Sequence, residues 1–383
     1  MALSSRAVPA PRPRPIILAS LALLSIVGQA AGADARDKPR ECRPSGQPVA
    51  MGAQGAIEVA EPLEYSGENS ILAADKAIKP SKLRLISASG EAVDLPNPPW
   101  TMEPTRWLSR GHAVYAVGTG RSQTPGKTDV VLVRWGMDSR PRLTKVATLD
   151  SITAPPRAAL VNEFMAVMWA EPGPNGKPIA RASFIDIEEV KVGAPVDLGA
   201  YTEGGFIEIA SAGKGFVALW SSAEGLMRAA FDVRGGGTAR ATALPWKDGS
   251  AVRSAITCGE RLWLVHSDDQ GKLAVSTSDP SSPLHRVASL AASDGDHASM
   301  LCAEDSAVVA HRVVNEKAGN VVLWLTTIEP SGKTHERRVK DVAGTADTIR
   351  MAALGGVGES RSAFWVEGDG QDAKLWSRAI TCD

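Results

Sequence analysis

The amino-acid sequence predicts an all-β protein, and three observations lead to this prediction. Apolar residues recur with a period of two, in runs whose two alternating faces are both apolar. Short strands of this kind come in groups of four, and the groups recur every 46 to 54 residues. The chain has 36 glycines and 25 prolines spread along its length, as many turns require. Four antiparallel strands per unit at this period are typical of the blades of a β-propeller.

The second strand of each unit is the most regular. It appears in residues 112–118 (HAVYAVG), 164–170 (FMAVMWA), 216–220 (FVALW), 261–267 (RLWLVHS), 306–312 (SAVVAHR) and 362–368 (SAFWVEG), with a fainter copy from Ile71. A polar turn and a third strand follow each run, and an inner strand precedes it, as in residues 206–212, 254–258 and 348–353. The outer strand ends in Leu or Val, at Leu95, Leu149, Leu198, Leu244, Leu290 and Val342.

The apolar faces decide between a propeller and its alternatives, an open sandwich and a β-solenoid. A sandwich strand has one polar face, and solenoid repeats are shorter than those seen here. A sheet with two apolar faces must pack on a neighbour on each side, and closing the ring covers the last two faces. We therefore predict a β-propeller.

The two ends of the chain predict how the ring closes. After Val342 come three further strands, in residues 348–353, 362–367 and 374–381, and the chain stops at Asp383 without a fourth. The strand-like segment 47–51 (QPVAM) has no unit of its own. We expect it to supply the missing outer strand, which gives seven four-stranded blades in a single domain over residues 47–383. Residues 34–46, which include Cys42, form a linker.

The four cysteines test this closure. Cys42 precedes the donated strand and Cys382 follows its expected partner, so antiparallel pairing brings them within reach of a disulfide. Cys258 and Cys302 end the inner strands of consecutive blades and are candidates for a second bridge. A bridge that closes so long a loop contributes about 5 kcal/mol on the chain-entropy model.

The first 33 residues have the pattern of a secretory signal peptide. Three arginines precede the apolar run 16–27 (IILASLALLSIV), and residues 31–33 (AGA) match a small-residue cleavage site. The apolar run is short for a transmembrane helix, although an uncleaved anchor is the alternative. We expect a soluble, monomeric protein in the periplasm or outside the cell, without a transmembrane segment after cleavage.

Charge and motifs narrow the function classes. The formal net charge of −1 and the lack of a long Lys/Arg run argue against nucleic acid as a partner. The chain has no G-x-S-x-G, H-E-x-x-H, phosphate-binding glycine loop or C-x-x-C motif. The sequence therefore leans away from an enzyme and predicts no cofactor.

Two sets of residues are candidate metal ligands. Aligning the second strands places His266, His311 and Glu367 at the position that holds tryptophan in two other blades, and His and Glu bind zinc. Inter-blade packing is the simpler interpretation of that position. The acidic turns that contain Asp269, Asp369 and Asp372 are the candidates for calcium. Hairpins, however, need polar glycine-containing turns in any case.

The ten tryptophans divide into two groups. Most fall on strands and are expected in the core. Trp100 and Trp246 fall in predicted loops between blades. Together with Trp107 they are candidates for contact with a partner.

Residues 215–236 (GFVALWSSAEGLMRAAFDVRGG) carry a resemblance to a known group. They resemble the repeats of secreted bacterial β-propeller proteins, of the form F-x-V-x-W…G…R-F-D-x-x-G, through Phe216, Trp220, Gly225, Arg228, Phe231, Asp232 and Gly235. The resemblance implies the fold and export, but no particular activity.

We carry two hypotheses for the function. The first is an exported binding or interaction module with a protein or glycan partner. The alternative is an extracytoplasmic hydrolase or lyase with its site in the central funnel. Ionisable groups converging on the axis would favour the enzyme, but inner strands such as IEIAS, AITC and SMLC are mostly apolar or small.

Overall fold

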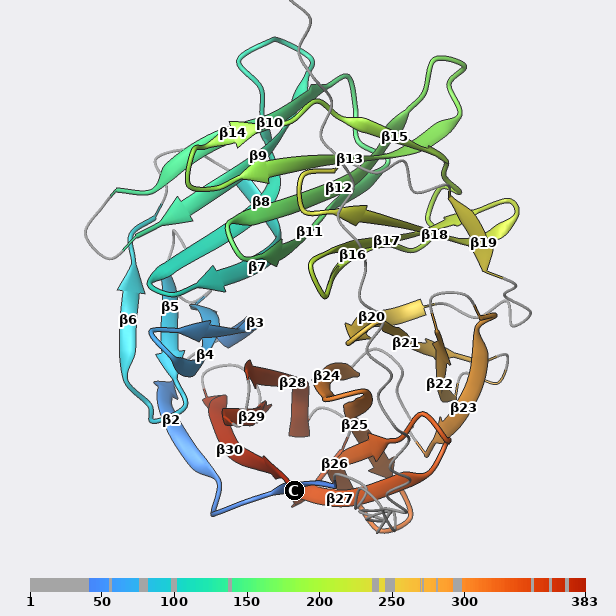
Figure 1. The fold of residues 1–383 in the computed structure, drawn as a ribbon. Coiled ribbons are helices and arrows are strands. Elements are labelled where there is room, and N and C mark those ends of the chain that lie inside the picture. The colour runs from blue at the N-terminus through green and yellow to red at the C-terminus, as the bar shows by residue number, and fades with distance from the viewer. Residues whose placement is uncertain are drawn as a thin grey trace, which may run out of the picture. The chain divides into compact units, whose positions relative to one another are not determined.

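The computed structural model describes residues 41–383 apart from 55–56, 76–81, 98–101, 137–139, 236–240, 245–251, 269, 271, 280–281, 292–297, 346–347, 358–359 and 369–371. Seven antiparallel sheets stand in a ring, each with its innermost strand towards the middle of the ring (Figure 1). The fold is the predicted seven-bladed β-propeller. The expected signal peptide, residues 1–33, lies outside the described residues. No helix in the described part of the chain is long and apolar enough to cross a membrane.

The first four blades follow one another in the chain. Blade 1 consists of β3 (Ile57–Tyr65), β4 (Glu68–Asp75), β5 (Lys82–Ser87) and β6 (Ala92–Leu95). Blade 2 consists of β7 (Met102–Arg110), β8 (Ala113–Arg121), β9 (Thr128–Trp135) and β10 (Arg142–Leu149). Blade 3 consists of β11 (Ala154–Val161), β12 (Phe164–Pro172), β13 (Pro178–Asp186) and a divided outer strand, β14 (Lys191–Val192) with β15 (Val196–Ala200). Blade 4 consists of β16 (Ile207–Ala212), β17 (Gly215–Ser222), β18 (Gly225–Asp232) and β19 (Thr242–Leu244).

The remaining three blades complete the ring. Blade 5 consists of β20 (Val252–Cys258), β21 (Arg261–Ser267), β22 (Leu273–Ser278) and β23 (His285–Leu290). Blade 6 consists of β24 (Ser299–Ala303), β25 (Ser306–Asn315), β26 (Asn320–Ile328) and β27 (Thr334–Ala343). Blade 7 consists of β28 (Ile349–Val357), β29 (Ser360–Glu367) and β30 (Lys374–Cys382), with β1 (Cys42–Pro44) and β2 (Val49–Gln54) as its outer strand.

Blade 7 confirms the predicted closure by the chain ends. Both β1 and β2 pair antiparallel with β30, in a register that sets Cys42 opposite Cys382. The two cysteines form a disulfide with a Cα–Cα distance of 4.0 Å. Cys258 and Cys302 form the second predicted bridge, with a Cα–Cα distance of 5.4 Å, which joins the inner strands of blades 5 and 6.

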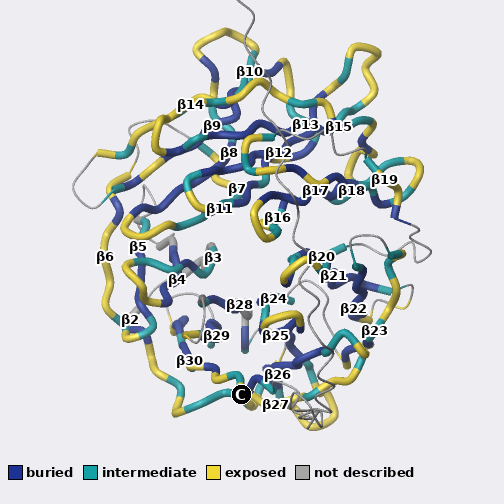
Figure 2. Tube along the Cα trace, viewed as in Figure 1, coloured by how far each residue is buried: buried dark blue, intermediate teal, exposed yellow. Residues whose placement is uncertain are grey.

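The core consists of the spaces between blades rather than one central mass. Each of the seven interfaces between adjacent blades holds its own cluster of buried apolar side chains. In β17, six consecutive residues from Gly215 to Trp220 are buried, which is possible only when both faces of the sheet are covered. Buried residues accordingly concentrate in the middle strands, and exposed residues in the outer strands (Figure 2).

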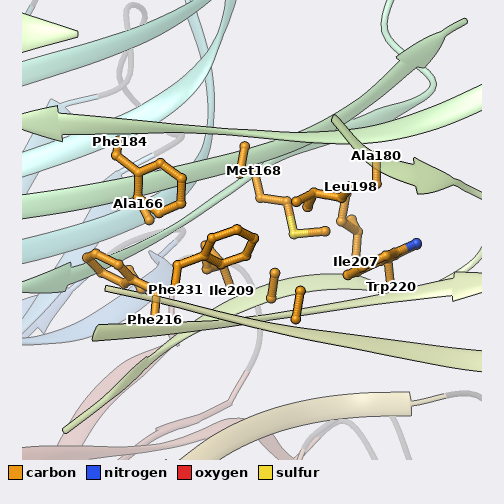
Figure 3. Packing of buried hydrophobic residues seen from close by; sticks show 14 of the residues in the cluster. Ala166, Met168, Ala180, Phe184, Leu198, Ile207, Ile209, Phe216, Trp220 and Phe231 are labelled. Atoms are coloured by element: carbon orange, nitrogen blue, oxygen red, sulfur yellow. The ribbon is translucent and has the colours of Figure 1, made fainter. Parts of the chain in front are cut away.

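The interface between blades 3 and 4 shows how this packing works. Phe184 of β13 packs against two phenylalanines of blade 4, with ring centroids 5.9 Å from Phe216 and 5.2 Å from Phe231 (Figure 3). Trp220 is 1% exposed and donates its indole N–H to the carbonyl oxygen of Ala200, at 3.1 Å. Burying one such side chain contributes about 1.5–3 kcal/mol. The hairpin of β17 and β18, whose sequence resembles the known repeats, therefore serves to pack the blades together.

Candidate functional site

The inner strands β3, β7, β11, β16, β20, β24 and β28 line a central channel of about 1610 Å³. Each inner strand turns into the second strand of its blade through a tight hairpin, in which the last inner residue pairs with the residue three positions later. Tyr65 pairs with Glu68 in blade 1, and Cys258 pairs with Arg261 in blade 5. Counting back from this hairpin therefore identifies equivalent positions in all seven blades.

Four residues before the hairpin, six of the seven blades carry a charged or hydroxyl side chain at the channel. We call the residues at this position in all seven blades the polar ring. They are Glu61, Arg106, Arg157, Glu208, Ser254, Ser299 and, as the one apolar member, Ala353. Charged side chains occupy blades 1 to 4, in the order acid, base, base, acid. Blades 5 to 7 contribute two hydroxyls and a methyl group.

Two residues closer to the hairpin, the same face of each inner strand is apolar. This apolar ring consists of Leu63, Leu108, Ala159, Ala210, Ile256, Leu301 and Gly355. Side chains two positions apart point to the same side of a strand and lie about 7 Å apart along it. The channel therefore has a charged level directly followed by an apolar level.

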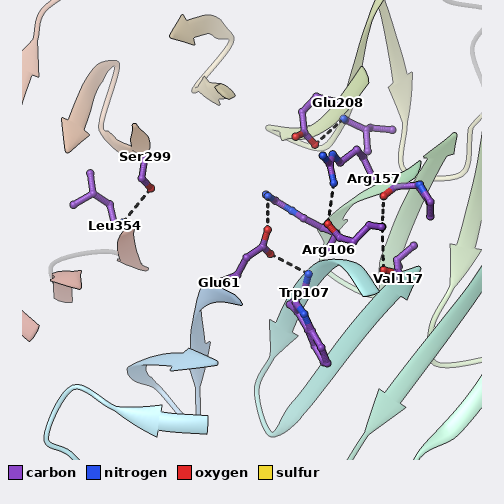
Figure 4. A network of polar contacts seen from close by, with 11 residues as sticks. Glu61, Arg106, Trp107, Val117, Arg157, Glu208, Ser299 and Leu354 are labelled. Carbon is purple, nitrogen blue, oxygen red and sulfur yellow. Dashed lines mark hydrogen bonds and ion pairs between the residues drawn. The ribbon is translucent and has the colours of Figure 1, made fainter. Parts of the chain in front are cut away.

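Glu61 and Arg106 form the central ion pair of the polar ring (Figure 4). The guanidinium Nη1 of Arg106 lies 2.8 Å from Oε1 of Glu61. The backbone N–H of Trp107 donates to the other carboxylate oxygen at 2.9 Å. Two consecutive residues of blade 2 thus engage both oxygens of one carboxylate of blade 1.

An equivalent contact recurs two interfaces away in the ring. Ser299 of blade 6 accepts a hydrogen bond of 3.1 Å from the backbone N–H of Leu354 in blade 7. Leu354 is equivalent to Trp107, and Ser299 is equivalent to Glu61. In both places a polar-ring side chain links its blade to the backbone of the next one.

Arg157 and Glu208 are bound differently. Nη1 of Arg157 donates to the backbone carbonyl oxygen of Thr105 at 2.9 Å, and the Glu208 carboxylate accepts from the adjacent N–H of Ile209 at 3.1 Å. They occupy equivalent positions in adjacent blades, yet neither forms a salt bridge with any described residue.

The four charged groups nevertheless act on one another. Burial raises the pKa of Glu61, the charge of Arg106 and the Trp107 N–H oppose this rise, and the charge of Glu208 adds to it. Desolvation alone would lower the pKa of Arg106, but the charges of Glu61 and Glu208 outweigh it, so the net shift is upward. Nε of Arg106 is buried and has no hydrogen-bond partner in the described part of the protein.

The histidines proposed as metal ligands are packing residues within their own blades. His266 and His311 do share one position, six residues into the second strand, and both are almost fully buried. Nε2 of His266 lies 2.9 Å from the Ser276 hydroxyl, and Nε2 of His311 lies 2.9 Å from that of Thr326. Burial lowers the pKa of His311 to about 4, so its ring is neutral at neutral pH.

Glu367 does not share the position of the two histidines, which corrects the sequence alignment. β29 begins at Ser360, so Trp365 is the sixth residue of this strand and Glu367 lies two residues beyond it. Glu367 accepts from the indole N–H of Trp365 at 2.8 Å and pairs with Lys340 at 3.3 Å. No three His, Cys, Asp or Glu residues within the described ranges form a metal-binding group.

The other candidates divide between the described and undescribed parts of the chain. Asp269, Asp369, Trp100 and Trp246 lie outside the described residues, and Asp372 is exposed. Trp107 is only 6% exposed, so the prediction that it meets a partner at the surface is wrong. It lies in β7, and its ring packs on Trp135 with centroids 5.3 Å apart.

A second, smaller cavity of about 370 Å³ lies beside the turn between β7 and β8. Its charged groups are engaged within the protein. Arg110 pairs with Glu188 at 3.0 Å, and the guanidinium of Arg134 lies over the ring of Tyr115. The polar ring remains the stronger candidate site.

The sequence contained a signal for the polar ring that pattern analysis missed. In every blade the inner strand and second strand are joined by a two-residue turn, and counting from that turn would have aligned the ring. The bulges in β3, β7, β11, β20 and β28 break the period-two pattern upstream of the ring and obscure these strands in the sequence.

Comparison with known proteins supports the fold. The chain matches no protein-family model and no curated protein. The BP39L lectin from Burkholderia pseudomallei has a TM-score of 0.53 at 12% identity, over 83% of this chain and 94% of the lectin. TolB from Acinetobacter baumannii has a TM-score of 0.42 at 11% identity, over 78% of this chain and 65% of TolB. AztD from Citrobacter koseri has a TM-score of 0.41 at 13% identity, over 86% and 89%.

The likeness to the BP39L lectin supports the fold-level resemblance to β-propeller proteins. The chain spans 65% of the length of TolB. At 12% identity, the likeness to the lectin shows the fold and not an activity.

Proposed function

We propose that this β-propeller is a binding module and that the polar ring of the central channel is its ligand site. One observation carries the proposal: six of seven equivalent positions around the channel hold charged or hydroxyl side chains. Some of these groups also link neighbouring blades, but a separate apolar cluster already fills each interface. A concave site with a few convergent polar groups beside apolar ones is the usual form of a small-molecule site.

Binding fits this ring better than hydrolysis. A hydrolase or lyase needs an acid and a base that both reach the substrate. Here Arg106 and the Trp107 N–H already engage both oxygens of Glu61, which leaves Glu208 as the remaining ring carboxylate. Glu64 also lines the channel, but it lies three residues further along β3, about 10 Å away along the strand.

The proposal places this module outside the cytoplasm. Two disulfides favour an oxidising compartment, and the pattern of residues 1–33 is that of a signal peptide. A protein or glycan held at the rim is the alternative mode of binding, and it predicts affinity that does not depend on the channel.

A ligand screen by thermal shift tests the channel. The purified protein is melted with representatives of five classes: amino acids, neutral monosaccharides, sugar acids, dicarboxylates and polyamines. A channel ligand raises the Tm of the wild-type protein but not of the R157Q/E208Q variant. The matched control R142Q/E189Q changes two exposed residues on blades 2 and 3 and keeps the wild-type response.

The outcomes separate the two modes of binding. A shift that survives in R157Q/E208Q places the ligand elsewhere, and the channel proposal is then wrong. A wild-type protein that responds to no class at millimolar concentration also contradicts it.

A further inference from the structure

The chemistry of the polar ring identifies a class of ligand, and this inference rests on the proposed function. Glu61 and Arg106 are each other's partners, and the Trp107 N–H completes the pair. Their formal charges cancel within blades 1 and 2. Arg157 and Glu208 therefore carry the charges with which a ligand in the channel would interact.

The contacts of Arg157 and Glu208 leave their charges unmatched. Each makes a hydrogen bond to a neutral backbone group, a carbonyl oxygen for Arg157 and an N–H for Glu208. These bonds satisfy one donor of Arg157 and one acceptor of Glu208, but neither bond brings an opposite charge to the side chain. Two charges in adjacent blades, neither in hydrogen-bond contact with an opposite charge, favour a ligand that brings both complements.

A ligand with one kind of charge gains little from this ring. An anion drawn to Arg157 meets the repulsion of Glu208, whose field already reaches across the channel to Glu61 and Arg106. A cation drawn to Glu208 meets Arg157 in the same way. Because the two acids and two bases sum to zero, only a molecule with separated opposite charges is attracted at both ends.

The neighbouring groups indicate what else the ligand carries. Leu108, Ala210 and Ile256 are the half-buried members of the apolar ring, and they receive an apolar substituent about 7 Å along the strands. We infer that the channel binds a small zwitterion, an α-amino acid with an apolar side chain, with its carboxylate at Arg157 and its ammonium at Glu208.

Isothermal titration of four related probes tests this assignment. L-Leucine carries both charges, N-acetyl-L-leucine lacks the ammonium, L-leucinamide lacks the carboxylate, and glycine lacks the side chain. Loss of one charged hydrogen bond weakens binding at least about tenfold, so wild-type protein binds leucine best. Glycine binds more weakly than leucine, because it leaves the apolar ring empty.

Two single variants make the test specific to each charge. E208Q no longer distinguishes leucine from N-acetyl-leucine, and R157Q no longer distinguishes leucine from leucinamide. Both substitutions keep the side-chain length close to the original, and circular dichroism with a melting curve verifies that each variant folds. The R142Q/E189Q control keeps the full wild-type preference.

Each alternative outcome has a distinct meaning. Equal binding of leucine and N-acetyl-leucine by wild-type protein overturns the zwitterion inference. So does ring-dependent binding of a sugar or dicarboxylate when no amino acid binds, although the binding-module proposal then stands. If no class binds in a way that depends on Arg157 and Glu208, both proposals are wrong.

Discussion

Cys42 and Cys382 are 340 residues apart in the chain, yet they face each other across β1 and β30 and are joined by a disulfide. The bridge fastens the outer strand of blade 7 to its neighbour, and so it holds the two chain ends in one sheet. Cys258 and Cys302, only 44 residues apart, join two blades that the chain already connects. The two bridges therefore differ greatly in the loop that each closes.

We expect removal of the closing bridge to cost more stability than removal of the inner one. On the chain-entropy model, a disulfide that closes a loop of 340 residues stabilises the folded protein by about 2 kcal/mol more than one that closes a loop of 44 residues. Urea unfolding of C42A/C382A and C258A/C302A measures the difference. Non-reducing peptide mapping of wild-type protein must first recover both links, and equal destabilisation of the two variants would contradict the closure argument.

The Glu61–Arg106 pair is expected to show coupling in a double-mutant cycle. R106Q leaves the Glu61 carboxylate in a site that already raises its pKa, whereas E61Q/R106Q leaves no charge. Channel water screens the pair, since the two side chains are 22% and 37% exposed, so the coupling is about 1 kcal/mol.

The pH dependence of R106Q provides a second readout of that pair. Without Arg106 the pKa of Glu61 in the folded protein lies further above its value in the unfolded chain. The stability of R106Q therefore improves as the pH falls through the folded-state pKa of Glu61. The same titration in E61Q/R106Q lacks this improvement. Additive single-mutant effects and parallel pH profiles would show that the two groups do not interact.

His311 is expected to make the protein less stable in acid. Burial lowers its pKa from 6.5 to about 4, so the unfolded chain binds this proton more readily than the folded protein. Its contribution is complete above pH 6.5 and is lost as pH falls towards 4, to a total of about 3 kcal/mol. H311Q, which does not titrate, shows a shallower loss of unfolding free energy between pH 7 and pH 4. H285Q, at an exposed position, keeps the wild-type slope.

Gly118 is expected to tolerate no side chain. It occupies in blade 2 the position that holds Trp220 in blade 4, and here the inner strand approaches closely. A Cβ atom would lie 2.2 Å from the carbonyl oxygen of Glu103, so the backbone of β7 must move. G118A costs at least about 2 kcal/mol in urea unfolding. G126A is the control, because Gly126 lies in a turn with a positive φ and open space around its Cβ. It measures the cost of the backbone conformation alone. An equal loss of stability in G118A and G126A would refute the steric argument.

Much of the fold followed from local pattern. Runs such as residues 216–220, apolar on both faces, predicted stacked blades, because an isolated sheet cannot cover two apolar surfaces. The missing fourth strand before Asp383 and the orphan segment near Met51 predicted seven blades and their closure. Strand period, repeat length and cysteine position are properties that the chain carries along its own length.

The candidate site followed only from tertiary structure. Glu61 and Glu208 act on each other although 147 residues separate them in the chain, because the ring brings equivalent strand positions to one level of the channel. Bulges in the inner strands break their alternation of apolar and polar residues. β29 starts two residues before its apolar run, and for that reason the sequence alignment put Glu367 at the wrong position. The sequence alone determined which segments form blades and how the ring closes. Only the closed ring decided which side chains meet at the axis, because that depends on hairpin register and on contacts between blades far apart in the chain.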